Sequence, residues 1–224
     1  MNALPVAVGG LAGLLLGCLA WLAAARFAAR YRMSGEVPGG GAPDSDERPV
    51  PAPAALSLAG MTLWGCWVGA QAPGLPLAVS ALVVTSLLLC IALVDFRVRR
   101  IPDDLTLALL GWAVVQGLWL GQPGWWSASV LGLVVAGGLF LLLYGLGRSA
   151  LGLGDVKLEA ALGALVGYPA VLAAMFAGVL AGGLAAAALL LARRAGRKDA
   201  FAYGPFLALG AWLVYTRLMG LWPG

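Results

Sequence analysis

Residues 75–95 read LPLAVSALVVTSLLLCIALVD, an apolar run that carries no charge until it ends at Asp95. A helix needs about 20 apolar residues to cross the hydrocarbon of a bilayer. By that measure we predict eight apolar segments, at 6–28, 56–72, 75–95, 104–121, 126–147, 155–167, 168–192 and 204–221. Alanine, leucine and glycine dominate them without an alternating polar pattern, which indicates helices rather than strands. The predicted fold is an all-α, polytopic transmembrane helix bundle of about eight spans.

The composition of the whole chain agrees with a lipid environment. Of its 224 residues, 62% are hydrophobic and 11% are charged, whereas a soluble domain carries about 25% charged residues. A water-soluble fold of this composition would leave much of its surface apolar. The length suits one bundle, and we expect membrane lipid, not nucleic acid, around it.

The basic residues predict how the bundle is oriented. If the segments alternate, nearly all of them fall on one side, which the positive-inside rule makes cytoplasmic, so the N-terminus is expected outside. These residues are Arg26, Arg30, Arg32, Arg48, Arg97, Arg99, Arg100, Arg148, Lys157, Arg193, Arg194, Arg197 and Lys198; only Arg217 departs from the pattern.

Three parts are expected along the chain. Residues 1–30 form an N-terminal transmembrane helix, which lacks the basic start and the cleavage site of a signal peptide. Residues 31–55 form a flexible cytoplasmic linker, because GEVPGGGAPDSDERP at 35–49 offers little to pack. Residues 56–224 form the main transmembrane bundle, in which Gly167-Tyr168-Pro169 is expected to turn a tight helical hairpin.

Several chemistries are excluded or disfavoured by what the chain lacks. It has no histidine, which excludes Ser-His-Asp and Cys-His catalysis and removes the commonest metal ligand. Cys18, Cys66 and Cys90 stand apart in apolar runs, without the spacing of a zinc site or a redox motif. We expect them to be buried as small hydrophobic residues, and we expect no metal site.

All ten acidic residues fall on the same predicted side as the basic ones. Five lie in the linker or in the loop before the last span, and five lie at span ends, where acidic groups are costly and are candidates for function. The second five are Asp95, Asp103, Asp104, Asp155 and Glu159. Asp103 and Asp104 follow Ile101-Pro102 and also suit a helix start, where they would act as structural caps.

Asp95 and Asp155 are the candidate catalytic pair. Each has a structural alternative: Asp95 can pair with Arg97 or Arg99 at the membrane surface, and Asp155, after Gly152-Leu153-Gly154, can be an N-cap. The predicted topology brings both to one membrane face at similar depth. Two converging carboxylates are the minimal equipment of an aspartic protease.

The same residues resemble a known family. Val94 to Asp103, VDFRVRRIPD, resembles the first catalytic motif of bacterial type IV prepilin peptidases, and Gly152 to Leu158, GLGDVKL, resembles their second. The second motif also has the Gly-x-Gly-Asp form of presenilin-like intramembrane aspartic proteases. Tyr203 to Ala208, YGPFLA, resembles the segment ahead of the family's last helix. The resemblance covers roughly residues 54–222.

The resemblance implies an intramembrane aspartic endopeptidase of the bacterial inner membrane, with its active site at the cytoplasmic face. Its implied substrates are prepilins or type II secretion pseudopilins, which carry a short basic leader ahead of a hydrophobic helix. No cofactor is implied. The catalytic pair carries over onto Asp95 and Asp155. Motif neighbours and candidate substrate-binding residues are Pro102, Asp103, Gly152, Gly154, Lys157, Glu159, Gly204 and Pro205.

The glycines and the helix ends add two physical expectations. Gly152 and Gly154 permit positive φ and a close approach of an extended substrate to Asp155. The helix dipole favours ionisation of Asp155 at a helix start over Asp95 at a helix end.

The N-terminal part departs from the family pattern. Bifunctional members, which also N-methylate the trimmed pilin, carry paired Cys-x-x-Cys motifs between the first two spans, and the linker here has no cysteine. Trp21 stands where the family usually has asparagine. We therefore expect peptidase activity without N-methyltransferase activity.

Two other functions use the same aspartates differently. A transporter would use them as an ion relay, and would favour acids at mid-bilayer depth and internal repeats, neither of which the sequence shows. A non-catalytic assembly subunit would use them only as caps.

Overall fold

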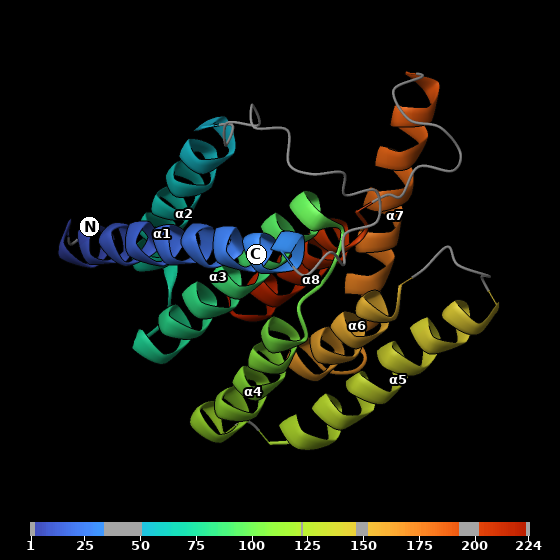
Figure 1. The fold of residues 1–224 in the computed structure, drawn as a ribbon. Helices are drawn as coiled ribbons and strands as arrows, with labels where there is room; N and C mark the ends of the chain where they lie inside the picture. Colours follow the sequence, from blue (N-terminus) through green and yellow to red (C-terminus); the bar gives the residue numbers. More distant parts are fainter. Residues whose placement is uncertain (1–2, 34–50, 122, 147–151, 193–201, 223–224) are drawn as a thin grey trace.

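The computed structural model describes residues 3–33, 51–121, 123–146, 152–192 and 202–222, and these ranges form α-helices joined by short connections (Figure 1). The helices are α1 (Ala3–Met33), α2 (Pro51–Gln71), α3 (Leu75–Val98), α4 (Asp103–Leu120), α5 (Trp125–Leu146), α6 (Leu153–Val166), α7 (Ala170–Leu191) and α8 (Gly204–Leu218). The all-α class is confirmed, and each predicted segment corresponds to one helix.

Four of these helices are long and apolar enough to cross a membrane by length and composition, within the residues that the structure describes. They lie at Leu4–Tyr31, Leu75–Val98, Trp125–Leu146 and Ala170–Leu191. Helices α6 and α8 have 14 and 15 residues, fewer than the roughly 20 that a perpendicular span needs. The chain is therefore a multi-pass helical membrane protein, and the predicted number of about eight spans stays a prediction.

Some helix ends differ from the predicted segments. Helix α1 continues to Met33, beyond the apolar segment that ends at 28, and α2 begins at Pro51. Charged and polar side chains end an apolar run without ending a helix, and arginine and methionine are good helix formers. Of the predicted linker, residues 34–50 lie outside the described residues. The expected hairpin is present, since three residues separate α6 from α7.

Glycine contacts bring three pairs of helices together. Gly9 and Gly13 of α1 face Gly65 of α2 so closely that an added Cβ would meet the opposite backbone. Gly132 of α5 meets Gly163 of α6 in the same way. Gly178 of α7 and Gly210 of α8 form the third such contact. Small residues that let backbones approach are typical of helix association in membranes.

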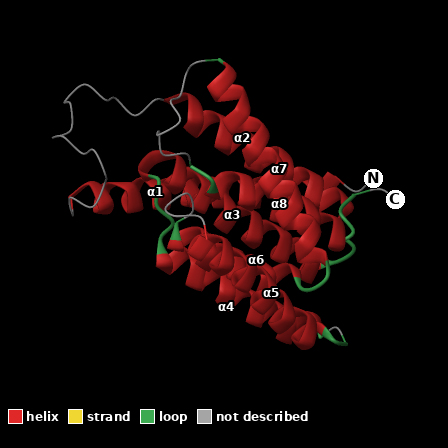
Figure 2. Ribbon diagram, turned by 90° about the vertical axis from the view of Figure 1, so that its right-hand side faces the viewer, coloured by secondary structure: helices red, strands yellow, loops and turns green. Residues whose placement is uncertain are grey.

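Helices α3 and α8 occupy the middle of the bundle. Figures 1 and 2 both show them between the α1–α2 pair and the group formed by α4, α5 and α6. The two central helices share a buried neutral polar cluster with α4, formed by Ser80, Trp112, Gln116 and Tyr215. Tyr215 donates to Gln116 Oε1 at 2.6 Å, and Ser80 donates to the same oxygen at 2.8 Å.

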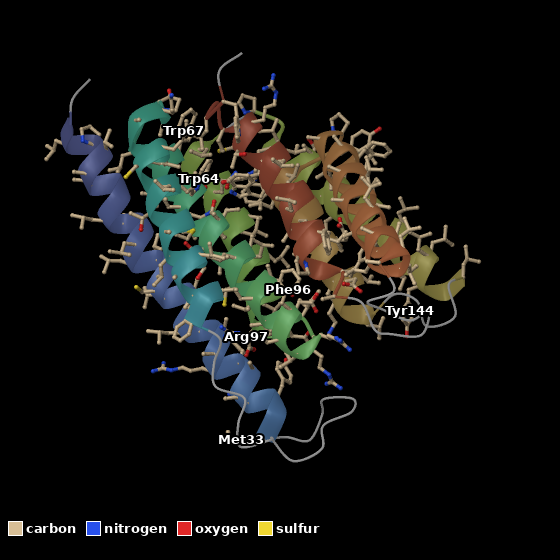
Figure 3. All side chains as sticks on the ribbon, turned by 90° about the horizontal axis from the view of Figure 1, so that it is seen from above. Met33, Trp64, Trp67, Phe96, Arg97 and Tyr144 are labelled. Carbon is tan, nitrogen blue, oxygen red and sulfur yellow. The ribbon has the colours of Figure 1, made fainter. Side chains whose placement is uncertain are left out.

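Charged helix ends meet at one end of the bundle. The last turn of α3 contacts the start of α8, and the starts of α4 and α6 are joined by an ion pair. Arg30, near the end of α1, lies 3.5 Å from Asp104 at the start of α4. Figure 3 shows Met33, Phe96 and Arg97 toward this end and Trp64 and Trp67 toward the other. The end where these charged groups meet therefore holds the candidate site.

Candidate active site

Asp95 is buried in the last turn of α3, with 4% of its surface exposed. Its Oδ2 accepts a hydrogen bond of 3.0 Å from the backbone N–H of Gly204, the first residue of α8. The first N–H groups of a helix have no partner within the helix and carry its positive dipole end. The start of α8 therefore supplies a donor and a favourable field to a carboxylate that sits at the unfavourable end of its own helix.

Gly204 makes this contact possible because it has no side chain. A Cβ at this position would lie 2.9 Å from Asp95 Oδ2 and 3.2 Å from its Cγ. Pro205 follows in the first turn of α8 and is buried. A proline there costs no helix hydrogen bond, so the YGP sequence starts the helix and leaves the Gly204 N–H free for Asp95.

Asp155 lies in the first turn of α6 and is half-buried. Its Oδ2 accepts a hydrogen bond of 3.0 Å from the backbone N–H of Gly152, which is the acidic half of a capping box. Gly152 has φ −88° and ψ 152°, an extended conformation that does not use the positive φ open to glycine. Its extended backbone instead turns its N–H toward the carboxylate three residues ahead.

The two aspartates belong to one group of side chains. Gly154, next to Asp155, and Gly204, which donates to Asp95, both face the side chain of Ile101. Ile101 belongs to the connection between α3 and α4, and its side chain lies close to both Gly154 and Gly204. An added Cβ at Gly154 would be 3.4 Å from Ile101 Cβ, and one at Gly204 would be 3.2 Å from Ile101 Cδ1.

A third carboxylate, Glu159, joins this pair, and we call Asp95, Asp155 and Glu159 the carboxylate cluster. Glu159 lies one turn after Asp155 in α6, is 2% exposed, and is acted on by the Asp155 charge. Tyr203, just before α8, borders the cluster: burial raises the pKa of its phenol, and the charges of Asp155 and Glu159 raise it further. Its hydroxyl donates to the Val179 carbonyl at 3.3 Å.

Lys157 and Asp103 tie the two catalytic motifs together at the surface. Lys157 Nζ lies 2.8 Å from both carboxylate oxygens of Asp103, and both side chains are more than half exposed. Pro102 is the N-cap residue of α4, and its carbonyl accepts from the N–H groups of Leu105 and Thr106. Asp103 is thus in the first helical turn, as a structural cap would be, but its carboxylate reaches across to α6.

Arg97, which the sequence offered as a partner for Asp95, reaches α1. Its guanidinium lies 5.6 Å from the centroid of the Trp21 ring, within the range of a cation–π interaction. Within the described residues, the ion pairs of the acidic span ends join Asp103 and Asp104 to basic side chains. Asp95 and Asp155 are held by backbone N–H groups.

Two residues of the site were not singled out from the sequence. Ile101 separates the two glycine positions, and Tyr203 lies beside Asp155 and Glu159. Both residues lie within the quoted motifs, and only this position in the sequence could have indicated that they belong to the site. Their roles depend on α8 returning to the end of α3, which neither motif reveals by itself.

The arrangement supports acid–base chemistry by two carboxyl groups. Like charges that lie close together disfavour double ionisation, so such a pair shares one proton. One member can then accept a proton while the other donates one. Asp155 is half-buried and Asp95 is buried, so Asp155 is the more accessible of the two.

Comparison with known proteins supports the resemblance expected from the motifs. Residues 82–187 match the type IV leader peptidase family, a segment that includes both Asp95 and Asp155. No solved structure matches the chain significantly.

Curated relatives carry a common name, prepilin leader peptidase/N-methyltransferase. The protein of that name from Pectobacterium carotovorum subsp. carotovorum is 34% identical over 69% of this chain and 52% of its own length. That from Neisseria gonorrhoeae is 34% identical over 65% of the chain and 51% of its own length. That from Bacillus subtilis is 32% identical over 60% and 54%. The chain spans about half the length of the curated relatives it matches.

Proposed function

We propose that this chain, a member of the type IV leader peptidase family, is an intramembrane aspartic endopeptidase that removes the leader peptide from prepilins. The observation that carries the proposal is that Asp95 and Asp155, one from each family motif, lie at the same end of the bundle around Ile101, inside the segment that matches the family. Residues 56–224 would form the peptidase domain, preceded by the helix at 1–30 and the linker at 31–55.

The hydrolysis needs one ionised and one protonated carboxyl group. The ionised aspartate takes a proton from water as the water oxygen bonds to the scissile carbonyl carbon. The protonated aspartate donates its proton to the carbonyl oxygen. When the C–N bond breaks, the first aspartate gives its proton to the leaving amine and the second takes a proton back from a hydroxyl of the diol intermediate, so the leader ends in a new carboxyl group.

The helix ends leave the assignment of these two roles open. Asp155 lies in the first turn of α6, and Asp95 accepts from the first N–H of α8. Both carboxylates are therefore favoured by a helix start, and the expected preference for an ionised Asp155 loses its basis. Either can be the base, and the roles exchange as the proton moves.

The proposed substrates are type IV prepilins or type II secretion pseudopilins with a hydrophobic N-terminal helix. The site would lie at the cytoplasmic face of the bacterial inner membrane, where the basic residues gather. Basic leader residues would meet the acidic side chains of this end, among which Asp103 is exposed and Glu159 is buried. Gly152, Gly154 and Pro102 would line the path of the extended chain.

We propose the peptidase activity alone. The relatives' names include an N-methyltransferase, and in the bifunctional family pattern that activity goes with paired cysteine motifs between the first two spans. The linker at 31–55 contains no cysteine.

The test is leader cleavage of a type IV prepilin in membranes that contain the protein, followed by mass spectrometry of both products. We expect the native protein to cleave, and Asp95→Ala and Asp155→Ala at equal expression to leave the prepilin intact. If the native protein is inert on several prepilins, the peptidase proposal fails and ion transport becomes the next assay. Cleavage that survives both substitutions would mean that other residues carry the reaction.

A further inference from the structure

An apolar groove lies between α2, α3 and α8, apart from the carboxylate cluster. Its volume is about 560 Å³, and four tryptophans, Trp64, Trp67, Trp212 and Trp222, line it together with aliphatic side chains. Helix α2 forms one wall, and α3 and α8 form the others. We call this feature the tryptophan groove.

The tryptophan groove presents ring faces rather than hydrogen-bonding groups. Trp67 Nε1 donates to the Leu221 carbonyl, Trp212 Nε1 to Thr85 Oγ1, and Trp222 Nε1 to Thr216 Oγ1, each at 3.0 Å. These three donors are satisfied within the chain, whereas the buried Nε1 of Trp64 has no hydrogen-bond partner among the described residues. The groove therefore offers mainly apolar contact, which suits a mainly apolar occupant.

The groove leads along α3 toward the candidate active site. Thr85 and Leu89 line it, and Phe96 follows Leu89 by seven residues, a spacing that places all three on one face of the helix. Phe96 is 62% exposed and follows Asp95 in the sequence, so its side chain points about 100° away from the buried carboxylate around the helix axis. At 1.5 Å per residue, Leu89 lies about 9 Å along the axis from Asp95. Figure 3 shows Phe96 near the charged end and Trp64 and Trp67 toward the other end.

The length of the groove suits several helical turns. On α2 its lining runs from Leu56 to Trp67, which at 1.5 Å per residue is about 16 Å, or three turns. The helices that hold Asp95 and its donor Gly204 are the same α3 and α8 that form two of its walls. A chain whose scissile bond lies at Asp95 is thus continuous with the groove if it goes on as an apolar helix.

We propose that the tryptophan groove binds the hydrophobic helix of the substrate, with its leader-proximal end at Phe96. This inference rests on the proposed function and adds where the uncleaved part of the substrate lies. The rival occupant is a lipid acyl chain, which also matches an apolar surface. We favour the substrate helix because the groove shares its walls with the carboxylate cluster.

Gly60 of α2 offers a way to fill the groove. It lines the groove, and an added Cβ there would meet nothing within 4 Å. Gly60→Trp therefore places a large ring in the groove without displacing neighbouring atoms at the Cβ. Gly138 of α5 is also exposed with nothing within 4 Å but lies on a helix that does not line the groove, so Gly138→Trp is the matched control.

The first measurement is kcat/KM for cleavage of an intact prepilin in bilayer nanodiscs. We expect Gly60→Trp to lower it about tenfold or more, equivalent to about 1.4 kcal/mol, and Gly138→Trp to match the native protein. Equal rates for all three would overturn the groove proposal and leave the peptidase function standing. No cleavage by the native protein would refute both.

A second variant gives a readout that does not depend on activity. A photo-crosslinking residue, p-benzoylphenylalanine, is placed at position 60 in an Asp95→Ala background, and prepilin is added before illumination. We expect a covalent adduct whose mass is that of enzyme plus prepilin, with the crosslink in the hydrophobic helix. Adducts with phospholipid alone, at prepilin concentrations that saturate cleavage by the native protein, would assign the groove to lipid and overturn the proposal.

Discussion

The carboxylate cluster and the neutral polar cluster are both buried and both touch α3, but they are built in opposite ways. In the neutral polar cluster, Ser80 and Tyr215 both donate to Gln116 Oε1, and Trp112 Nε1 donates to Ser80 Oγ at 3.2 Å. In the carboxylate cluster the side chains are acceptors of like charge: Asp95 accepts from the backbone N–H of Gly204 in α8, and Asp155 from that of Gly152 at the start of its own helix.

This difference separates stability from chemistry. A neutral cluster of side chains that hydrogen-bond across three helices holds those helices together, although Gln116 Nε2 has no partner among the described residues. Burying several acidic side chains close together costs free energy, and such groups are found mainly at functional sites. We therefore expect substitutions in the first cluster to change unfolding and substitutions in the second to change cleavage.

The largest of the supporting effects is expected at Gly204. Gly204→Ala would place a Cβ 2.9 Å from Asp95 Oδ2, so the carboxylate must move. A displacement of about 1 Å in a catalytic group can cost about 100-fold in rate, and we expect a fall in kcat of that order. Steady-state cleavage of a prepilin measures it. Gly138→Ala, in open space on α5, should cleave normally, and a normal rate for Gly204→Ala would show that the contact is dispensable.

The neutral polar cluster should respond in stability. Tyr215→Phe removes a donor from the buried Gln116 Oε1 and a partner from Ser80. We expect a loss of about 1–2 kcal/mol in the free energy of unfolding, measured by denaturant titration in detergent, with near-native cleavage below the transition. If Tyr215→Phe instead abolished cleavage at unchanged stability, the division between the two clusters would be wrong.

The smallest effect is expected at the surface ion pair. Lys157 and Asp103 are more than half exposed, and exposed pairs contribute about 0.2–1 kcal/mol. A double-mutant cycle of Lys157→Met and Asp103→Asn should return a coupling energy in that range, and added salt should reduce it. A coupling of several kcal/mol would show that this bridge, rather than the helix packing, holds the two motifs together.

Much of the site was predictable because chemistry and topology point to the same residues. Asp95 and Asp155 interrupt a chain with few charges, and counting the spans between them places both at one end of the bundle. The all-α fold follows from the length of the apolar runs. The segment that matches the family, residues 82–187, includes both aspartates.

The contacts that complete the site depend on long-range packing. Gly204 is 109 residues from Asp95, and Tyr215 is 135 residues from Ser80. No local pattern shows which backbone N–H will face a carboxylate. Gly152 is a local example: glycine permits positive φ, but the residue adopts an extended conformation. Apolar composition likewise does not separate a short packed helix from one that crosses the membrane, so the number of spans stays a prediction.

The central claim is that Asp95 and Asp155 act as one catalytic unit. Its most direct test is single-turnover cleavage of a prepilin by the native protein, Asp95→Asn, Asp155→Asn and the double variant, each checked for native unfolding behaviour. Groups that act together show non-additive losses, so each single variant should lose about 100-fold to 10,000-fold and the double variant should lose no more. Losses that multiply, or a single variant that cleaves at near-native rate, would contradict the account.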